Sequence, residues 1–214
     1  MAAGRGLRMM PLTKKIPKAM TPFLNSTLIA HAIKNLKKQV NKIHVTVGYK
    51  GSLLSSHLIS NNVDTIINSS KKTNSWWIYN SVLSNLNEPV LVLTCDNIVN
   101  ENFSIYIDEF NKRKNCECLI VSAKPVKNID GDYLKYDKNL CIKNISRNNK
   151  SRVYASGIQV INPYLLNNQK KGKNFNEIWH HLINQKKIHI SKKIIKNWYS
   201  IDTLEQLNIF NKNI

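Results

Sequence analysis

The chain is 214 residues long and 42% hydrophobic, which suits a single α/β domain with a sizeable buried core. Its 32 lysines and arginines outweigh 13 acidic residues and give a formal net charge of +19, but the excess is spread along the whole chain. Aromatic residues do not alternate with arginines as a base-stacking surface requires, so we expect no specific nucleic-acid binding. The longest apolar run, residues 90–95, is far shorter than the roughly 18 residues of a membrane span. The N-terminus lacks the apolar segment of a signal peptide, so we expect no membrane partner and a cytoplasmic location.

Residues 1–20 combine glycines with fixed cations, which is the chemistry of a phosphate-binding loop. Gly4 and Gly6 allow backbone N–H groups to approach phosphate oxygens closely. Arg8 and Lys18 can neutralise the phosphates that those groups hold. The segment lacks the Gly-Lys-Ser/Thr ending of a Walker loop, and Met9 stands where the dinucleotide motif has its third glycine. The spacing therefore indicates phosphate binding without naming the ligand.

After this loop the sequence alternates between helical and strand patterns, beginning with a helix over 28–40 that Ser26 or Thr27 caps. This alternation predicts βα units on a largely parallel sheet. The helix expected within 71–86 turns inward the side chains of Trp77, Val82, Leu83 and Leu86. The other expected elements are strands at 43–47, 63–67, 90–93, 118–123, 140–145 and 154–160, and helices at 53–59, 103–112, 175–183 and 204–210.

One aspartate stands where an α/β sheet would present it to a ligand. The apolar strand at 90–93 delivers Asp96 at its carboxyl end, and ligands bind beyond the carboxyl ends of strands in such sheets. Asp96 is one of only 13 acidic residues, so we favour a ligand-binding role over a turn or helix-capping role. Asp202 lies just before the expected last helix and could cap it.

The string Ala-Ala-Gly-x-Gly-x-Arg-Met-x-Pro-Leu-Thr at 2–13, followed by Pro-Lys at 17–18, resembles the signature of the sugar-phosphate nucleotidyltransferases. Residues 198–203 are similar to the family's terminal Trp-x-x-Ile-Asp-Thr. The resemblance implies a Rossmann-like three-layer sandwich with a mixed, mostly parallel sheet. It also implies one domain, 1–214, with a mainly nucleotide-binding half at 1–125 and a mainly acceptor-binding half at 126–214.

The start of the chain departs from the family pattern. In the family a buried strand leads into the glycine loop, whereas this chain opens on the loop itself, so its first β-strand is expected to be missing. Two explanations are open: the given sequence starts downstream of the true N-terminus, or the sheet lacks this strand. We favour the first, because a sheet without the strand would leave backbone groups of the neighbouring strands unpaired.

The resemblance also assigns roles to residues. Arg8, Lys18 and Asp96 would be catalytic, and Asp96 and Asp202 would hold a Mg²⁺ ion, which prefers oxygen ligands. Asn74 stands where many members have a glycine-rich loop against the nucleotide base. The complete expected nucleotide site is Ala2, Ala3, Gly4, Gly6, Arg8, Lys18, Asn74 and Asp96.

The expected acceptor site differs from that of many members. Their Glu-Lys pair, whose lysine holds the acceptor phosphate, is replaced here by the stretch 144–147. Arg147, Lys150 or Arg152 is therefore the expected cation, because a guanidinium or an ammonium can pair with a phosphate monoester. Gly157, on the strand at 154–160, would leave room for the acceptor.

The function implied by the resemblance is transfer of a nucleotide to a phosphorylated sugar or alcohol, with release of pyrophosphate. The Asn74 segment looks more like that of the choline-phosphate cytidylyltransferases, so CTP is favoured, with UTP, GTP and dTTP also open. The product would be a precursor of surface polysaccharide or a related glycoconjugate. Two alternatives remain: a non-catalytic, nucleotide-binding regulatory relative, and a basic nucleic-acid-binding domain.

Overall fold

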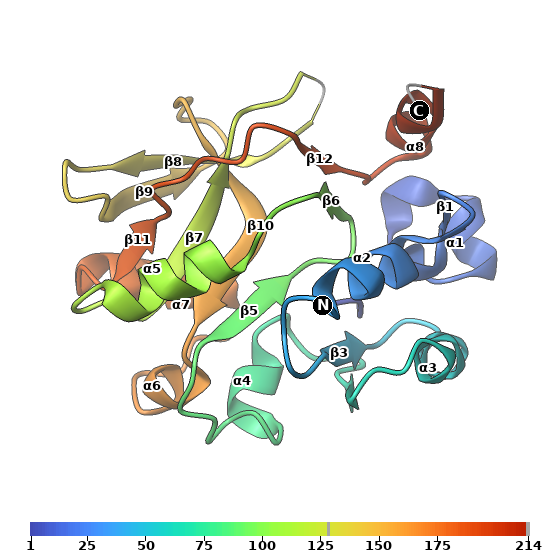
Figure 1. Cartoon of the computed structure of the whole chain (residues 1–214), viewed down its shortest axis with the longest axis horizontal. Helices are drawn as coiled ribbons and strands as arrows, with labels where there is room; N and C mark the ends of the chain where they lie inside the picture. The colour runs from blue at the N-terminus through green and yellow to red at the C-terminus, as the bar shows by residue number, and fades with distance from the viewer. Residues whose placement is uncertain (128, 213–214) are drawn as a thin grey trace. The chain divides into compact units, whose positions relative to one another are not determined.

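The computed structural model describes residues 1–127 and 129–212, and the chain forms two compact units (Figure 1). Unit 1 consists of residues 1–72, 94–100 and 200–214, and unit 2 of residues 73–93 and 101–199. Unit 1 therefore joins three segments that are far apart in the sequence. Within the described ranges, no helix has the length and apolar character needed to span a bilayer.

Unit 1 contains a parallel pair of strands, β3 (His44–Val47) and β4 (Thr65–Asn68). The helix α3 (Gly51–Ser60) connects them, as a parallel connection requires. The predicted helix after the loop is α2 (Leu28–Leu36), and Thr27 is its N-cap, because its Oγ1 accepts a hydrogen bond from Ala30 N at 3.2 Å. The remaining elements of unit 1 are η1 (Leu7–Met9), α1 (Leu12–Lys15), η2 (Lys18–Met20), β1 (Pro22–Phe23), β2 (Ser26–Thr27), β6 (Asn97–Val99) and α8 (Leu204–Lys212).

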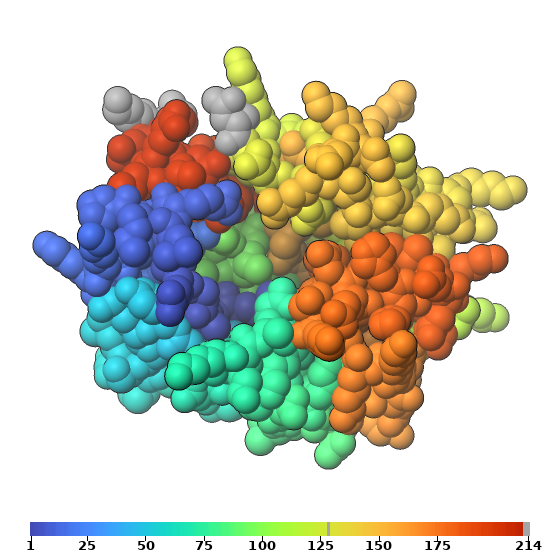
Figure 2. All heavy atoms as spheres, turned by 180° about the vertical axis from the view of Figure 1, so that it is seen from behind, coloured from blue at the N-terminus to red at the C-terminus, as the bar shows by residue number. Residues whose placement is uncertain are grey.

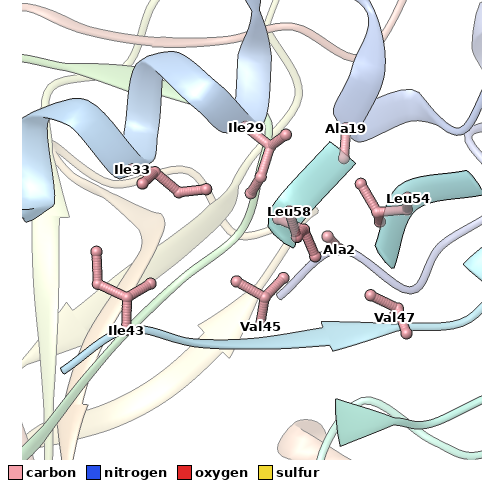
Figure 3. Packing of buried hydrophobic residues seen from close by; sticks show 9 residues of the cluster. All are labelled: Ala2, Ala19, Ile29, Ile33, Ile43, Val45, Val47, Leu54 and Leu58. Atoms are coloured by element: carbon pink, nitrogen blue, oxygen red, sulfur yellow. The ribbon is translucent and has the colours of Figure 1, made fainter. Parts of the chain in front are cut away.

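The hydrophobic core of unit 1 lies between α2, α3 and β3 (Figure 3). Ala2 and Ala19, which are 4% and 1% exposed, belong to this core. The segment that begins and ends with these two alanines is therefore anchored in the core at both ends, and the glycines and Arg8 lie between the anchors. The nine buried residues of the cluster are Ala2, Ala19, Ile29, Ile33, Ile43, Val45, Val47, Leu54 and Leu58.

The first three residues form backbone hydrogen bonds with two neighbouring segments of unit 1. Ala2 N donates to Thr46 O on β3, and Tyr49 N donates to Ala3 O, both at 3.0 Å. Cys95 N donates to Met1 O at 3.1 Å. Met1 to Ala3 thus connect β3 with the segment that carries Asp96. Among the described residues no strand is assigned before the loop.

The C-terminal helix α8 also belongs to unit 1. The ring of Phe210 lies against that of Phe23, with centroids 5.1 Å apart. Figure 2 shows the red atoms of this helix next to the blue atoms of the first 25 residues. The last helix is thus held against the start of the chain, and Asp202 lies two residues before it.

Unit 2 is built on a six-stranded mixed sheet whose order is β11-β7-β10-β8-β9, with β5 also paired to β10. β11 (Ile188–Ile190) runs parallel to β7 (Cys118–Ala123). β10 (Tyr154–Ile161) is antiparallel to β5 (Val90–Leu93), β7 and β8 (Asp132–Tyr136). β9 (Ile142–Ser146) is in turn antiparallel to β8. Figure 1 draws α5 in front of these strands and α7 behind them. The α/β class and the mixed sheet are confirmed.

Among the remaining elements of unit 2, the helices at 104–112 and 175–184 and the strand at 142–146 were predicted, whereas the helix at 163–167 and the strand at 198–200 were not. These elements are α4 (Trp76–Asn80), α5 (Ser104–Lys112), β8 (Asp132–Tyr136), β9 (Ile142–Ser146), α6 (Pro163–Asn167), α7 (Phe175–Asn184) and β12 (Trp198–Ser200), whose last residue belongs to unit 1. The helix expected within 71–86 is only α4. It ends at Asn80, because the next residue, Ser81, is extended and its Oγ donates to Trp77 O at 2.6 Å. Val82 is therefore 77% exposed, and the prediction that it points inward was wrong.

Candidate functional site

Lys18 lies at the centre of a charge cluster formed by Arg8, Lys18, Asp96 and Asp202, all in unit 1. Its Nζ donates to Asp96 Oδ2 at 2.6 Å and to Asp202 Oδ1 at 2.7 Å. Arg8 Nη2 lies 3.0 Å from the same Asp202 oxygen. The opening segment, the middle of the chain and the C-terminal segment thus each contribute charged side chains to one place.

Backbone and capping hydrogen bonds position the two carboxylates. Ile201 N donates to Asp96 O at 3.0 Å, which joins the two segments directly beside the aspartates. Thr203 caps α8, because Gln206 N donates to its Oγ1 at 3.2 Å. In return, Gln206 Oε1 accepts from Thr203 N at 3.1 Å, and it also accepts from Asp202 N at 2.7 Å. This is a capping box. The carboxylate of Asp202 is not the helix cap that one interpretation allowed; it faces Lys18 and Arg8 instead.

The ion pairs shift the protonation equilibria of the charge cluster. Burial disfavours the charged form of Lys18, but the attraction of Asp96 and Asp202 outweighs it, so the pKa of Lys18 lies above its usual value. Burial also disfavours the charged form of Asp96, but Lys18 and a hydrogen bond from Thr94 outweigh it and lower the pKa of Asp96. Burial and the nearby Asp96 charge raise the pKa of the Cys95 thiol to about 11. At neutral pH the cluster therefore holds a charged lysine and charged Asp96 next to a neutral thiol.

The glycine loop, residues 3–13, is shaped around Lys18. Gly6 has a φ of 62°, in the left-handed region, and a Cβ there would lie 2.8 Å from Lys18 Cβ. The site thus requires glycine at this position for its backbone conformation and for the packing of the lysine stem. A Cβ at Gly4 would meet nothing within 4 Å, and Gly4 is exposed. No protein neighbour within that distance requires a glycine there, and the backbone is open to a ligand.

Tyr49 holds the glycine loop at both ends. Its backbone N donates to Ala3 O, and its Oη donates to Thr13 O, both at 3.0 Å. Thr13 Oγ1 donates to Gly6 O at 2.9 Å, which ties the end of the loop to its middle. Next to Tyr49, Gly48 packs so closely on the loop that a Cβ would lie 2.7 Å from Ala3 O. Both residues thus position the loop.

The roles of Gly48, Tyr49 and Thr13 in positioning the loop were not predicted from the sequence. A glycine-tyrosine pair directly after the alternating strand at 43–47 was a detectable signal of a constrained turn. The hydrogen bond from Tyr49 to Thr13 links residues 36 positions apart, so its partner was not predictable from local pattern.

The predicted site residues in unit 2 have the following surroundings. Asn74 Oδ1 accepts from Phe175 N at 3.1 Å, at the start of α7. Arg147 is 73% exposed and its Nε lies 3.1 Å from Asp132 Oδ1, and Arg152 is exposed. Gly157 has a φ of 78° and lies within the register shift of β10 against β7. Their proposed roles remain predictions.

Asp96 and Asp202 form a donor set that fits a magnesium ion. Mg²⁺ is typically bound through one or two carboxylates together with water and substrate phosphates. The two carboxylates already converge on a single cation, the Lys18 ammonium. In the ranges 1–127 and 129–212, the structure has no group of three or more His, Cys, Asp or Glu residues that could hold a metal ion. An ion here would thus take its other ligands from water and substrate.

The nucleotidyl transferase family profile matches residues 1–176, and the chain belongs to this family. The bifunctional protein GlmU of Methanococcus aeolicus is 25% identical over 131 residues, which cover 56% of this chain and 32% of that protein. The CTP:phosphoglutamine cytidylyltransferase of Campylobacter jejuni is 39% identical over 77 residues, covering 35% of this chain and 30% of that protein. The matches thus span about a third of the length of these curated relatives.

A solved structure supports the same fold over nearly the whole chain. The CTP:phosphocholine cytidylyltransferase from Streptococcus pneumoniae has a TM-score of 0.75 to this chain and is 18% identical to it. The match covers 99% of this chain and 96% of that one. The predicted resemblance to the family and its Rossmann-like fold is confirmed.

Proposed function

We propose that this protein joins a nucleoside triphosphate, with CTP favoured, to a phosphorylated sugar or alcohol and releases pyrophosphate. One observation carries the proposal: Lys18 pairs with both Asp96 and Asp202, and its stem packs on the glycine loop. Phosphate-binding backbone, two cations and two carboxylates are therefore available in one place. A non-catalytic relative has no need to keep both carboxylates beside the lysine.

The glycine loop and Arg8 would bind the triphosphate. The open backbone at Gly4 allows N–H groups to approach phosphate oxygens. The Arg8 side chain is 57% exposed and pairs with Asp202 at 3.0 Å, so its guanidinium can turn to the β- and γ-phosphates. It would then stabilise the charge of the departing pyrophosphate.

Lys18 would stabilise the α-phosphate, where negative charge shifts in the transition state. Asp96 and Asp202 would hold Mg²⁺, which when bound supplies positive charge to the α-phosphate and the acceptor phosphate. The acceptor's phosphate oxygen would attack the α-phosphorus, and the bond between that phosphorus and the oxygen leading to the β-phosphorus would break. A phosphate monoester is already anionic at neutral pH, so the reaction requires no general base. The protein's contribution is alignment and charge neutralisation.

The identities of the base and the acceptor follow from weaker observations. Two relatives named above are CTP-dependent by name, and Asn74 replaces the glycines typical of many family members. Arg147 and Arg152 are the exposed cations proposed for the acceptor phosphate, with Gly157 nearby in sequence. We place the reaction in the cytoplasm, as a step that activates a precursor of surface polysaccharide or a related glycoconjugate.

A pyrophosphate-release assay tests this proposal. CTP, UTP, GTP and dTTP are each incubated with a panel of phosphorylated sugars and alcohols, with Mg²⁺ or with EDTA. We expect Mg²⁺-dependent release, fastest with CTP. Asp96→Asn should abolish turnover while retaining the fold, whereas Asp108→Asn on the exposed face of α5 should match the wild type. Full activity of Asp96→Asn, or no release with any pair, would refute the proposal; triphosphate binding without release would identify a regulatory relative.

A further inference from the structure

Lys18 lies where a divalent ion held by both aspartates would lie. Its Nζ is 2.6 Å from Asp96 Oδ2 and 2.7 Å from Asp202 Oδ1. A Mg²⁺ ion bound to both oxygens would be about 2.1 Å from each. The ion and the ammonium would then be in direct contact, which two positive charges do not tolerate. Only one of them can be paired with the two carboxylates in this way.

The charge balance of the cluster opposes the entry of a metal alone. Two carboxylates and the cations Arg8 and Lys18 neutralise one another. A divalent ion entering alone would displace Lys18 from both partners and leave its charge uncompensated, although the lysine side chain is only 12% exposed. A triphosphate brings several negative charges, so Lys18 and Arg8 gain new partners at the moment they lose the carboxylates.

We infer that Lys18 closes the metal site of the nucleotide-free protein, so that a divalent ion binds there only together with a triphosphate that draws Lys18 onto its phosphates. The inference depends on the proposed function for the identity of the metal site. It makes Lys18 a gate in addition to its proposed role at the α-phosphate. Metal and triphosphate then strengthen each other's binding by the same factor.

The packing around Lys18 fits a side chain that redirects only its end. The stem is held against Gly6, where a Cβ would lie 2.8 Å from Lys18 Cβ and 3.3 Å from Cγ. Gly6 belongs to the phosphate-binding loop, so the stem already lies beside the place proposed for the phosphates. Rotation of the terminal bonds can therefore move Nζ from carboxylate to phosphate without moving the backbone.

Binding of Mn²⁺ without any nucleotide, measured by electron paramagnetic resonance, tests the gate. We expect Lys18→Met to bind Mn²⁺ at least about tenfold more tightly than the wild type, because Asp96 and Asp202 then lack their shared cation. Lys15→Met removes a charge from an exposed position three residues earlier and should match the wild type. The double variant Lys18→Met, Asp96→Asn should lose the gain. Equal Mn²⁺ affinity of wild type and Lys18→Met would overturn the inference.

Thermal unfolding provides a second measurement on the same variants. Lys18→Met leaves two partly buried carboxylates without their shared cation, so its Tm should fall by about 5–15 °C. Mn²⁺ alone should restore much of this loss, and should leave the Tm of the wild type unchanged. A Lys18→Met protein that folds only in the presence of Mn²⁺ would meet the same expectation. A wild-type Tm that rises with Mn²⁺ alone as much as that of the variant would contradict it.

The NMR signal of the Lys18 Nζ can be measured in the wild type, so this test does not require any variant to fold. The ammonium signal of ion-paired Lys18 should persist in Mg²⁺ alone and shift when Mg²⁺ and CTP are added together. A shift in Mg²⁺ alone would overturn the gate. The proposed function and the gate can be refuted separately. If the wild type releases pyrophosphate but also binds Mn²⁺ tightly without nucleotide, only the gate is refuted. If Mn²⁺ restores the Tm of Lys18→Met but the wild type releases no pyrophosphate, only the proposed enzymatic function is refuted.

Discussion

Gly48→Ala tests whether the glycine loop is held by close packing on the strand end. Gly48 has no positive φ, so alanine fits its backbone conformation, and any loss of stability must come from the added Cβ. That atom would lie 2.7 Å from Ala3 O and 2.9 Å from Ala3 Cβ. Ordinary contacts begin near 3.4 Å, so Ala3 would have to move by roughly half an ångström or more.

Such a movement strains the hydrogen bonds that fix the start of the loop. Tyr49 N donates to Ala3 O and Ala2 N donates to Thr46 O, both at 3.0 Å. Overpacking of this kind costs about 1–3 kcal/mol. For a chain of this size the expected fall in Tm is then about 3–10 °C. Because Ala3 begins the proposed phosphate-binding loop, the KM for the triphosphate should rise as well.

Thermal unfolding followed by far-UV circular dichroism measures the change, and Gly51→Ala is the matched control. A Cβ at Gly51, the first residue of α3, would lie 3.6 Å from Val47 Cγ2, an ordinary contact. This variant should keep or slightly raise the Tm, because alanine restricts the unfolded chain more than glycine does. A Gly48→Ala protein as stable as Gly51→Ala would refute the account of the loop.

Three further predictions concern the loop and the charge cluster. Tyr49→Phe removes the hydrogen bond to Thr13 O and should raise the KM for the triphosphate several-fold with a smaller change in kcat; an unchanged KM would make Tyr49 structural only. Lys18→Ala should lower kcat by about 100-fold or more in steady-state assays, and a near-wild-type rate would exclude a transition-state contact. Because folding lowers the pKa of Asp96, its stabilising contribution is present above the unfolded pKa of about 3.9 and is lost as the pH falls below it; acid unfolding curves of Asp96→Asn should accordingly show a weaker pH dependence than those of the wild type.

The sequence predicted most elements and the charged residues that lie together. Alternation of helix and strand patterns indicated the α/β class, and the strand ending before Asp96 indicated where a ligand-binding carboxylate would be presented. The proximity of Asp202 to Asp96 did not follow from any local pattern, because 106 positions separate them in the sequence. It came from the resemblance to the nucleotidyltransferases.

Some local side-chain contacts did not follow from the hydrophobic pattern. Val82 belongs to a helical apolar pattern, but Ser81 ends the helix by hydrogen-bonding to Trp77 O, and Val82 is exposed. The capping box of Thr203 and Gln206 was visible in the sequence as Thr-x-x-Gln, and it leaves the Asp202 carboxylate to the charge cluster. Single hydrogen bonds determine where the side chains of Val82 and Asp202 lie, and the spacing of hydrophobic residues does not predict such bonds.

A crystal structure with Mn²⁺ and a non-hydrolysable CTP analogue tests the central claim most directly, because anomalous scattering locates the metal. The account predicts one manganese peak within coordination distance of both Asp96 and Asp202. It also predicts that Lys18 Nζ has left its positions 2.6 Å and 2.7 Å from these carboxylates and contacts a phosphate oxygen. A triphosphate bound away from the glycine loop, or manganese bound elsewhere while Lys18 stays paired with both aspartates, would contradict it.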